Sequence, residues 1–162
     1  MSVRVKPKSA VEEFLEEEKP VVEEEEEEEV EQDPIDIITE QFENSPDRET
    51  IERWKRDFGS VSAYAPDPET LFLIRPLRRI EHKRISADLR LLSEGEMARR
   101  DPSFVEDQLH EKVISTCLLF PAADQDLFTM SEAGLTPTLF ALIMVNSKFV
   151  EPESAMRNTF RL

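Results

Sequence analysis

The sequence is poor in the residues that most recognisable catalytic and metal sites need. It has three glycines, two histidines and one cysteine among 162 residues. So few glycines leave little material for a glycine-rich phosphate loop, and two histidines are too few for a multi-histidine metal site. The single Cys117 cannot form a disulfide within the chain, which is typical of a reducing compartment.

Long apolar runs are also absent. No window approaches the roughly 18 uninterrupted apolar residues that mark a membrane-spanning helix. The first residues, Met1–Lys6, lack the apolar stretch of a secretory signal peptide. We therefore expect an intracellular, soluble protein with no membrane partner.

What the chain does contain is acidic charge, concentrated at its start. Its formal net charge is −16, and residues 1–50 carry 19 acidic residues against five basic ones. Glutamates follow one another in runs, the longest being Glu23–Glu29. High charge with little apolar surface cannot offset chain entropy, so we predict that residues 1–44 form a largely disordered acidic arm. The arm is either a solubilising tail or a segment that binds a basic partner. For the second reading, Phe14 and Leu15 are the candidate contacts, because they share a short helical apolar face with Val11.

The remaining pattern predicts a small α+β domain over residues 45–150, mostly helical with one β-hairpin, followed by a loose tail over 151–162. Cap and stop residues predict a helix over 47–58, and residues 34–42 read as a short helix leading into the domain. Turn residues between 61–64 and 71–74 predict the hairpin. Helical periodicity predicts three further helices: one from Leu77 with its apolar face at Ile80, Ile85, Leu89 and Leu92, one from Asp101-Pro102 ending after Phe120, and one from Thr136-Pro137 fading near Ser147.

The apolar positions of these elements predict the core. We expect the following side chains to be mostly buried: Trp54, Phe72, Leu109, Val113, Cys117 and Phe140. Cys117 falls on the apolar stripe of its helix, where a free cysteine acts as a small hydrophobe rather than a nucleophile. Glu106 and His110 share a helix face, but they supply only two ligands where zinc needs three or four from the protein. We predict no catalytic residue, cofactor or metal.

One polar cluster stands apart from the charge runs, namely Arg75, Arg78, Arg79, Lys83 and Arg84. It is either a solvated helix face or a surface for a partner. Nucleic acid is disfavoured, because residues 51–162 carry no net positive charge and are joined to the acidic arm. The cluster therefore favours protein contact, either with the acidic arm itself or with an acidic stretch of another protein.

The order of signals over residues 48–149 resembles a known family. A helix containing Glu49–Lys55 is followed by Phe58-Gly59-Ser60-Val61 and the strand 71–74. The junction Arg75-Pro76-Leu77 leads into a basic helix, which is followed by a cysteine-containing helix ending in Cys117-Leu118-Leu119-Phe120-Pro121 and by a small last helix. This order resembles small tail-assembly proteins of contractile-tailed bacteriophages, among them tail-assembly chaperones and baseplate-hub assembly proteins. The chain departs from them by its poly-glutamate run and by Pro66-Asp67-Pro68 at the hairpin turn.

The resemblance implies a non-enzymatic, chaperone-like factor that binds tape-measure or baseplate-hub proteins in the host cytoplasm. Two alternatives stay open: a minor structural component of the tail or baseplate, and an acidic inhibitor that mimics DNA. The mimic is the weaker of the two, because such proteins spread their acids over a folded surface. Self-association is compatible with each of them.

Overall fold

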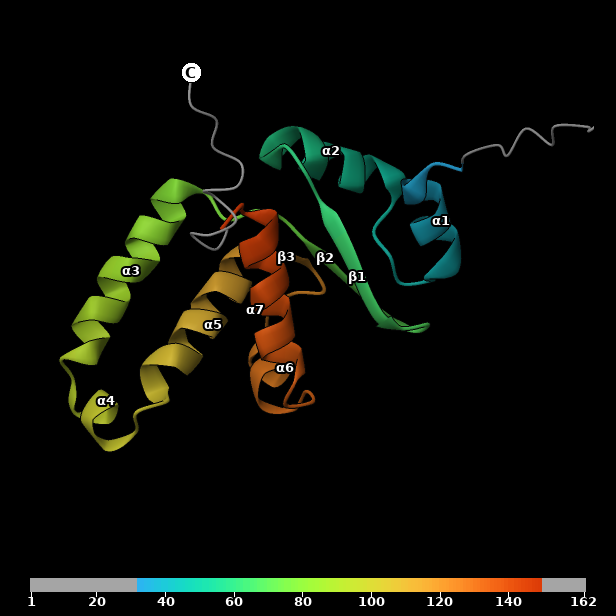
Figure 1. Ribbon diagram of the computed structural model, residues 1–162. Coiled ribbons are helices and arrows are strands. Elements are labelled where there is room, and N and C mark those ends of the chain that lie inside the picture. The colour runs from blue at the N-terminus through green and yellow to red at the C-terminus, as the bar shows by residue number, and fades with distance from the viewer. Residues whose placement is uncertain (1–31, 150–162) are drawn as a thin grey trace, which may run out of the picture. The chain divides into compact units, whose positions relative to one another are not determined.

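The computed structural model describes residues 32–149, and within that range the chain is an α+β domain of seven helices and one three-stranded antiparallel sheet (Figure 1). The predicted fold class is confirmed. Residues 1–31 and 150–162 are outside the described range, and with them most of the predicted acidic arm, its candidate contacts Phe14 and Leu15, and the predicted tail.

Two capped helices begin the domain. In α1 (Pro34–Gln41), the carboxylate of Asp33 accepts a hydrogen bond from the Ile35 amide, and Pro34 occupies the first helical position. In α2 (Arg48–Phe58), Asp47 caps the amide of Thr50, and the helix ends at Gly59, whose φ of 85° suits glycine. The helix predicted over 47–58 is therefore confirmed.

The predicted hairpin is present and gains a third strand. β1 (Ser62–Asp67) pairs with β2 (Thr70–Ile74), and Asp67 closes the turn by accepting hydrogen bonds from the amides of Glu69 and Thr70. β3 (Leu118–Phe120) pairs with the other edge of β2. The sequence predicted helix through Phe120, which is wrong, because the helix ends at Cys117 and the next three residues extend to complete the sheet.

Five helices follow β2, interrupted only by β3. They are α3 (Arg79–Ser93), α4 (Glu96–Arg100), α5 (Phe104–Cys117), α6 (Gln125–Thr129) and α7 (Leu135–Asn146). α4 and α6 were not predicted from the sequence, because each spans only five residues. α7 begins at Leu135, so Pro137 lies within its first turn rather than at its first position.

The sheet separates two hydrophobic clusters, because alternate side chains of β2 point to opposite faces. Phe72 and Ile74 join the larger cluster with α3, α5 and α7, while Leu71 and Leu73 join the smaller one with α1 and α2 (Figure 1). Of the predicted core, Phe72, Val113 and Cys117 are buried, whereas Trp54, Leu109 and Phe140 are half-buried.

The N-terminal boundary of the domain needs correction. Ile35 of α1 and Phe42 just after it are buried in the smaller cluster beside Ile51. Residues 33–44, which the sequence analysis assigned to the acidic arm, therefore contribute to the folded domain. Their acidic neighbours obscured that signal: Asp33 and Asp36 both pair with Arg48 at the start of α2.

Candidate functional site

The surface suggested by the sequence is the basic junction between β2 and α3, and its first member is not available to a partner. The Arg75 side chain is buried, with 7% of the residue exposed. Its guanidinium makes two hydrogen bonds to the Glu81 carboxylate, of 2.8 and 2.9 Å, and a third, of 2.7 Å, to the carbonyl of Thr116. It also lies over the Phe58 ring, 4.5 Å from the centroid. Including Arg75 among the partner-binding residues was therefore wrong.

Arg75 instead fixes the junction. It follows the last residue of β2, and its amide donates to the carbonyl of Cys117 at the end of α5. The next residue, Pro76, has no amide hydrogen and cannot continue the strand. A buried, bidentate arginine thus joins β2, α3 and α5 at the point where the chain changes direction.

Glu81 is the partner that makes this arrangement possible. Besides Arg75 it accepts a hydrogen bond of 2.8 Å from the Arg78 amide, which caps the start of α3. Hydrogen bonding from Arg75 is the main cause that holds the pKa of the Glu81 carboxyl below its ordinary value. Glu81 is therefore ionised at neutral pH, and its carboxylate points toward Arg75 rather than into solvent.

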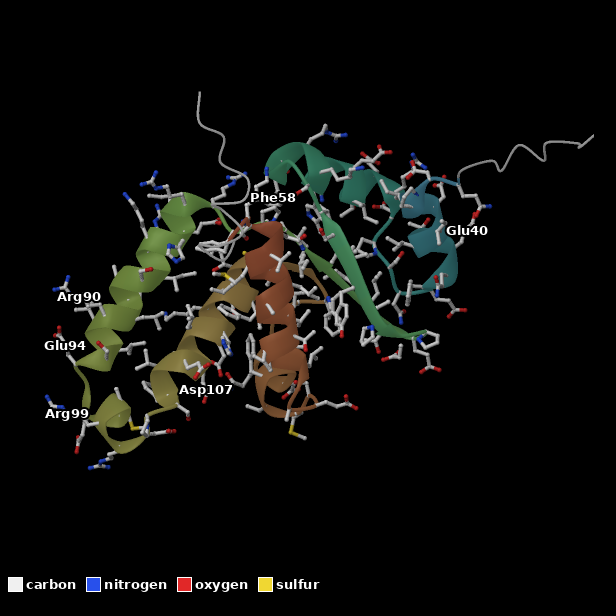
Figure 2. All side chains as sticks on the ribbon, in the orientation of Figure 1. Glu40, Phe58, Arg90, Glu94, Arg99 and Asp107 are labelled. Carbon is white, nitrogen blue, oxygen red and sulfur yellow. The ribbon has the colours of Figure 1, made fainter. Side chains whose placement is uncertain are left out.

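Arg78 connects the start of α3 to the end of α2. Its guanidinium donates a hydrogen bond of 2.6 Å to the Asp57 carbonyl in the last turn of α2, and it lies 5.3 Å from the centroid of the Phe58 ring. Figure 2 shows Phe58 at this end of α2, beside the start of α3. Arg78 is exposed, yet its side chain is already used to hold the two helices together.

Arg79, Lys83 and Arg84 are the predicted residues that remain exposed and accessible. None of the three takes part in an ion pair within residues 32–149. Arg79 is the first residue of α3, where the free amide groups at the helix start produce positive potential, so a basic residue there is locally unfavourable. Lys83 and Arg84 lie in the second turn, beyond the reach of that effect.

The helical pattern predicted the wrong orientation for Ile80. It was predicted to face the core, but it is 55% exposed, whereas Ile85 is buried and Leu89 and Leu92 are half-buried. Leu77 suggested the wrong phase, because it is buried but precedes the helix, which begins two residues later at Arg79.

With its phase corrected, α3 presents a surface that we call the α3 outer face. It consists of Ile80, Lys83, Arg84, Ala87 and Leu91, flanked by Arg79 and Arg90, and all seven residues are exposed. The two acidic residues inside the helix point elsewhere: Glu81 to Arg75, and Asp88 to Lys112 of α5 at 3.4 Å. In Figure 2, Arg90 points away from the fold on the same side as Arg99 of α4.

The apolar members of this face were missed by the sequence analysis. A signal for them was present, because Ala87 and Leu91 follow Ile80 by seven and eleven residues, which places all three on one side of a helix. The buried stripe on the opposite side of α3 has the same period, so the sequence alone does not say which stripe faces the core.

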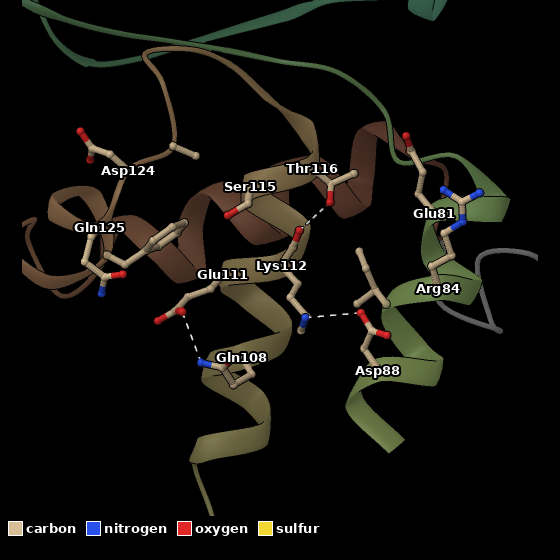
Figure 3. A pocket seen from close by; sticks show the side chains of 13 residues that line it. Glu81, Arg84, Asp88, Gln108, Glu111, Lys112, Ser115, Thr116, Asp124 and Gln125 are labelled. Atoms are coloured by element: carbon tan, nitrogen blue, oxygen red, sulfur yellow. Dashed lines mark hydrogen bonds and ion pairs between the residues drawn. The ribbon is translucent and has the colours of Figure 1, made fainter. Parts of the chain in front are cut away.

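A cleft of about 590 Å³ lies beside this helix, between α3, α5 and the segment leading into α6. Charges of both signs line it: Figure 3 shows Lys112 reaching across to Asp88, and Glu111 held by Gln108. The lining as a whole has four acidic and two basic side chains, one of each joined in the Lys112–Asp88 ion pair.

The two residue types most often found at reactive sites have other surroundings here. Cys117 is fully buried, and burial raises the pKa of its thiol to about 12. His110 packs against the Phe140 ring, with centroids 4.3 Å apart. Across residues 32–149 no three histidine, cysteine or acidic side chains gather as metal ligands would.

No helix in the described part of the chain has both the length and the apolar composition needed to cross a membrane. Comparisons with protein-family models, with curated proteins and with solved structures gave no match.

Proposed function

We propose that this protein is a non-enzymatic assembly factor of a contractile phage tail or baseplate hub, which holds a tape-measure or hub protein in the host cytoplasm until it is incorporated. The proposal rests first on the family resemblance in the sequence. The order of elements supports it: α2, the hairpin strand β2, the Arg75-Pro76-Leu77 junction, the basic helix α3, the cysteine-containing α5 and the short α7 follow one another as in that family.

The single observation that carries a binding role is the α3 outer face. Exposed apolar side chains and basic side chains without ion pairs lie together there, on a helix whose start is fixed by Arg75 and Glu81. A surface used only for solvation has no need of three exposed apolar side chains, Ile80, Ala87 and Leu91, aligned among its bases. A protein that holds another protein needs such a rigid, partly apolar surface.

Co-expression with tail proteins tests the function. The full chain is tagged and produced together with the tape-measure protein, and separately with the hub proteins, encoded in the same genome. An assembly factor increases the soluble yield of one of them and co-purifies with it. Solubility and recovery of every tail protein that are the same with and without the chain overturn the proposal.

Purified particles separate the assembly factor from the structural alternative. An assembly factor is absent from the mature tail or present far below the copy number of hub proteins, as quantitative mass spectrometry would show. A constant copy number per particle assigns the chain to the tail structure instead.

A further inference from the structure

The α3 outer face has the pattern of one half of a two-helix interface. Ile80, Ala87 and Leu91 form an apolar line along it, with the small Ala87 between two larger side chains. Apolar residues seven apart, and four beyond that, are the spacing at which two helices pack side by side. Scattered exposed apolar residues are common on protein surfaces, whereas their alignment along one exposed helix face is informative.

Basic residues accompany this line along its length. Arg79, Lys83, Arg84 and Arg90 lie on or beside it, and no ion pair within residues 32–149 neutralises any of them. In paired helices, charges beside the apolar line select a partner of opposite charge. At the start of α3 the helix dipole adds to the positive potential, which a partner's carboxylates would offset.

We propose that the α3 outer face binds an acidic amphipathic helix of a partner protein, with the partner's apolar stripe on Ile80, Ala87 and Leu91 and its carboxylates against the flanking bases. This inference rests on the proposed function and specifies the chemistry of the partner segment. Held at its start by the Arg75–Glu81 pair and by Arg78, α3 is ordered before the partner arrives, which reduces the entropy lost on binding.

Two other occupants fit the surface less well. A nucleic acid would match the bases but would leave Ile80 and Leu91 against a charged phosphate backbone. A second copy meeting through the same face would set the four bases of each copy against one another. A partner helix with Glu or Asp beside Leu or Ile satisfies both the apolar line and the charge.

The test is peptide binding to the full-length chain, measured by fluorescence anisotropy at low and at physiological salt. The probe is a synthetic helical peptide with Leu at heptad positions a and d and Glu at e and g. Its control has the same composition in scrambled order, and single-stranded DNA serves as a second control ligand. We expect the patterned peptide to bind, and the scrambled peptide and the DNA to bind at least about tenfold more weakly.

The protein variants locate the binding surface. The double change Lys83→Glu with Arg84→Glu should weaken peptide binding by about tenfold or more at low salt, and by less at high salt. Its matched control is Arg53→Glu with Arg56→Glu on α2, which makes the same change in charge at two exposed bases without ion pairs. Leu91→Ser should weaken binding while leaving its salt dependence unchanged. Circular dichroism confirms that each variant is folded.

Several results would overturn the inference. They are equal weakening by the two double variants, equal binding of the patterned and scrambled peptides, tighter binding of DNA, and no peptide binding at all.

Sedimentation of the chain alone assigns the face to a second copy instead if self-association is present and is lost in the Lys83→Glu, Arg84→Glu variant. Co-purification of a tail protein that persists in that variant overturns the α3 assignment and leaves the proposed function standing. If no tail protein co-purifies with the unaltered chain, the proposed function is wrong, and the peptide result is judged separately.

Discussion

Arg75 shows how one residue can look like a binding residue in the sequence and be part of the framework in the structure. It is the first of five bases within ten residues, and nothing in the order of letters separates it from the others. Its difference comes from Glu81, six residues later, and from the Thr116 carbonyl, 41 residues later. The second contact is long-range, so periodicity within one helix cannot predict it.

The Arg75–Glu81 pair gives stability a specific dependence on pH. Because the pKa of Glu81 is lower in the folded protein than in the unfolded chain, the pair contributes its full stabilisation above the ordinary glutamate pKa of about 4.3. The contribution is lost as the pH falls through the lower, folded pKa. Glu81→Gln should therefore reduce the free energy of unfolding by about 2 kcal/mol at neutral pH, since Arg75 stays buried without its counter-charge.

Urea denaturation of both proteins between neutral pH and pH of about 3 measures this effect. The difference between them should shrink as the solution is acidified. Glu96→Gln is the control, because Glu96 pairs with Arg100 in a fully solvated position, at 75% side-chain exposure, and its loss should leave the midpoint unchanged. A difference that is constant over the whole pH range would show that Glu81 acts by packing and not by charge.

Cys117 offers a chemical test of the core. Its side chain is inaccessible and the pKa of its thiol is raised to about 12, so almost no thiolate forms at mildly alkaline pH. We expect a thiol reagent to leave the native protein unlabelled over minutes at pH of about 8 and to label it rapidly in urea. Rapid labelling without denaturant would contradict the packing of α5 against β2 and α7.

At the scale of elements, local cap and turn signals were reliable for α2 and for the hairpin, whereas Thr136-Pro137 placed the start of α7 too late. Asp47 and Gly59 delimit α2, and Asp67 closes the hairpin, each through contacts within a few residues. β3 had no such signal, because Leu118–Phe120 continue the apolar stripe of α5 and become a strand only by pairing with β2. The prediction of which side of α3 faces the core was wrong for a related reason. Both sides of that helix carry apolar residues, and only tertiary packing determines which side is buried.

The same distinction decides how much each aromatic residue contributes. Phe72 lies in the middle strand with 3% exposure and is enclosed by α5 and α7, whereas Phe140 of α7 is half-buried and packs against His110. Phe72→Ala should therefore cost about 3–5 kcal/mol, which is the range for a fully enclosed phenylalanine. Phe140→Ala should cost clearly less, because solvent already reaches its ring.

Thermal or urea unfolding of the two variants, measured side by side, tests this order. The sequence predicted both side chains to be mostly buried, because each falls in an apolar run. Equal destabilisation would mean that the outer side of α7 is covered in solution. Tyr64, which stacks on Phe72 with ring centroids 6.2 Å apart, is the neighbour expected to move when Phe72 is removed.

Across the whole molecule, charge is divided along the chain. Residues 32–50 carry six acids and one base, while residues 75–84 carry five bases and one acid. The proposed acidic partner would therefore be repelled from the α1 region and attracted to the start of α3, which would orient the encounter before any contact forms. The fold class and the basic cluster could be predicted from composition and spacing. Which of those bases stay accessible could not, because that depends on Glu81 and Asp57 in the folded chain.

The N-terminal boundary of the domain can be tested by truncation. Removing residues 1–44 takes away α1 with its buried Ile35 and Phe42, and also the Asp33 and Asp36 partners of Arg48. Loss of two buried apolar side chains from the smaller cluster should lower the free energy of unfolding by about 3 kcal/mol or more.

A chain that begins at Gln32 is the matched control for that truncation. It keeps every contact of the smaller cluster and loses a segment of 13 acids and four bases, for which the sequence predicts no contribution to the core. Its urea midpoint should stay close to that of the full chain, while the chain that begins at Ser45 unfolds earlier. If instead the two truncated chains unfold together, close to the full chain, α1 contributes nothing and the domain begins where its acidic composition first suggested. If both unfold early, residues 1–31 stabilise the domain directly, because the control retains α1 with all of its contacts.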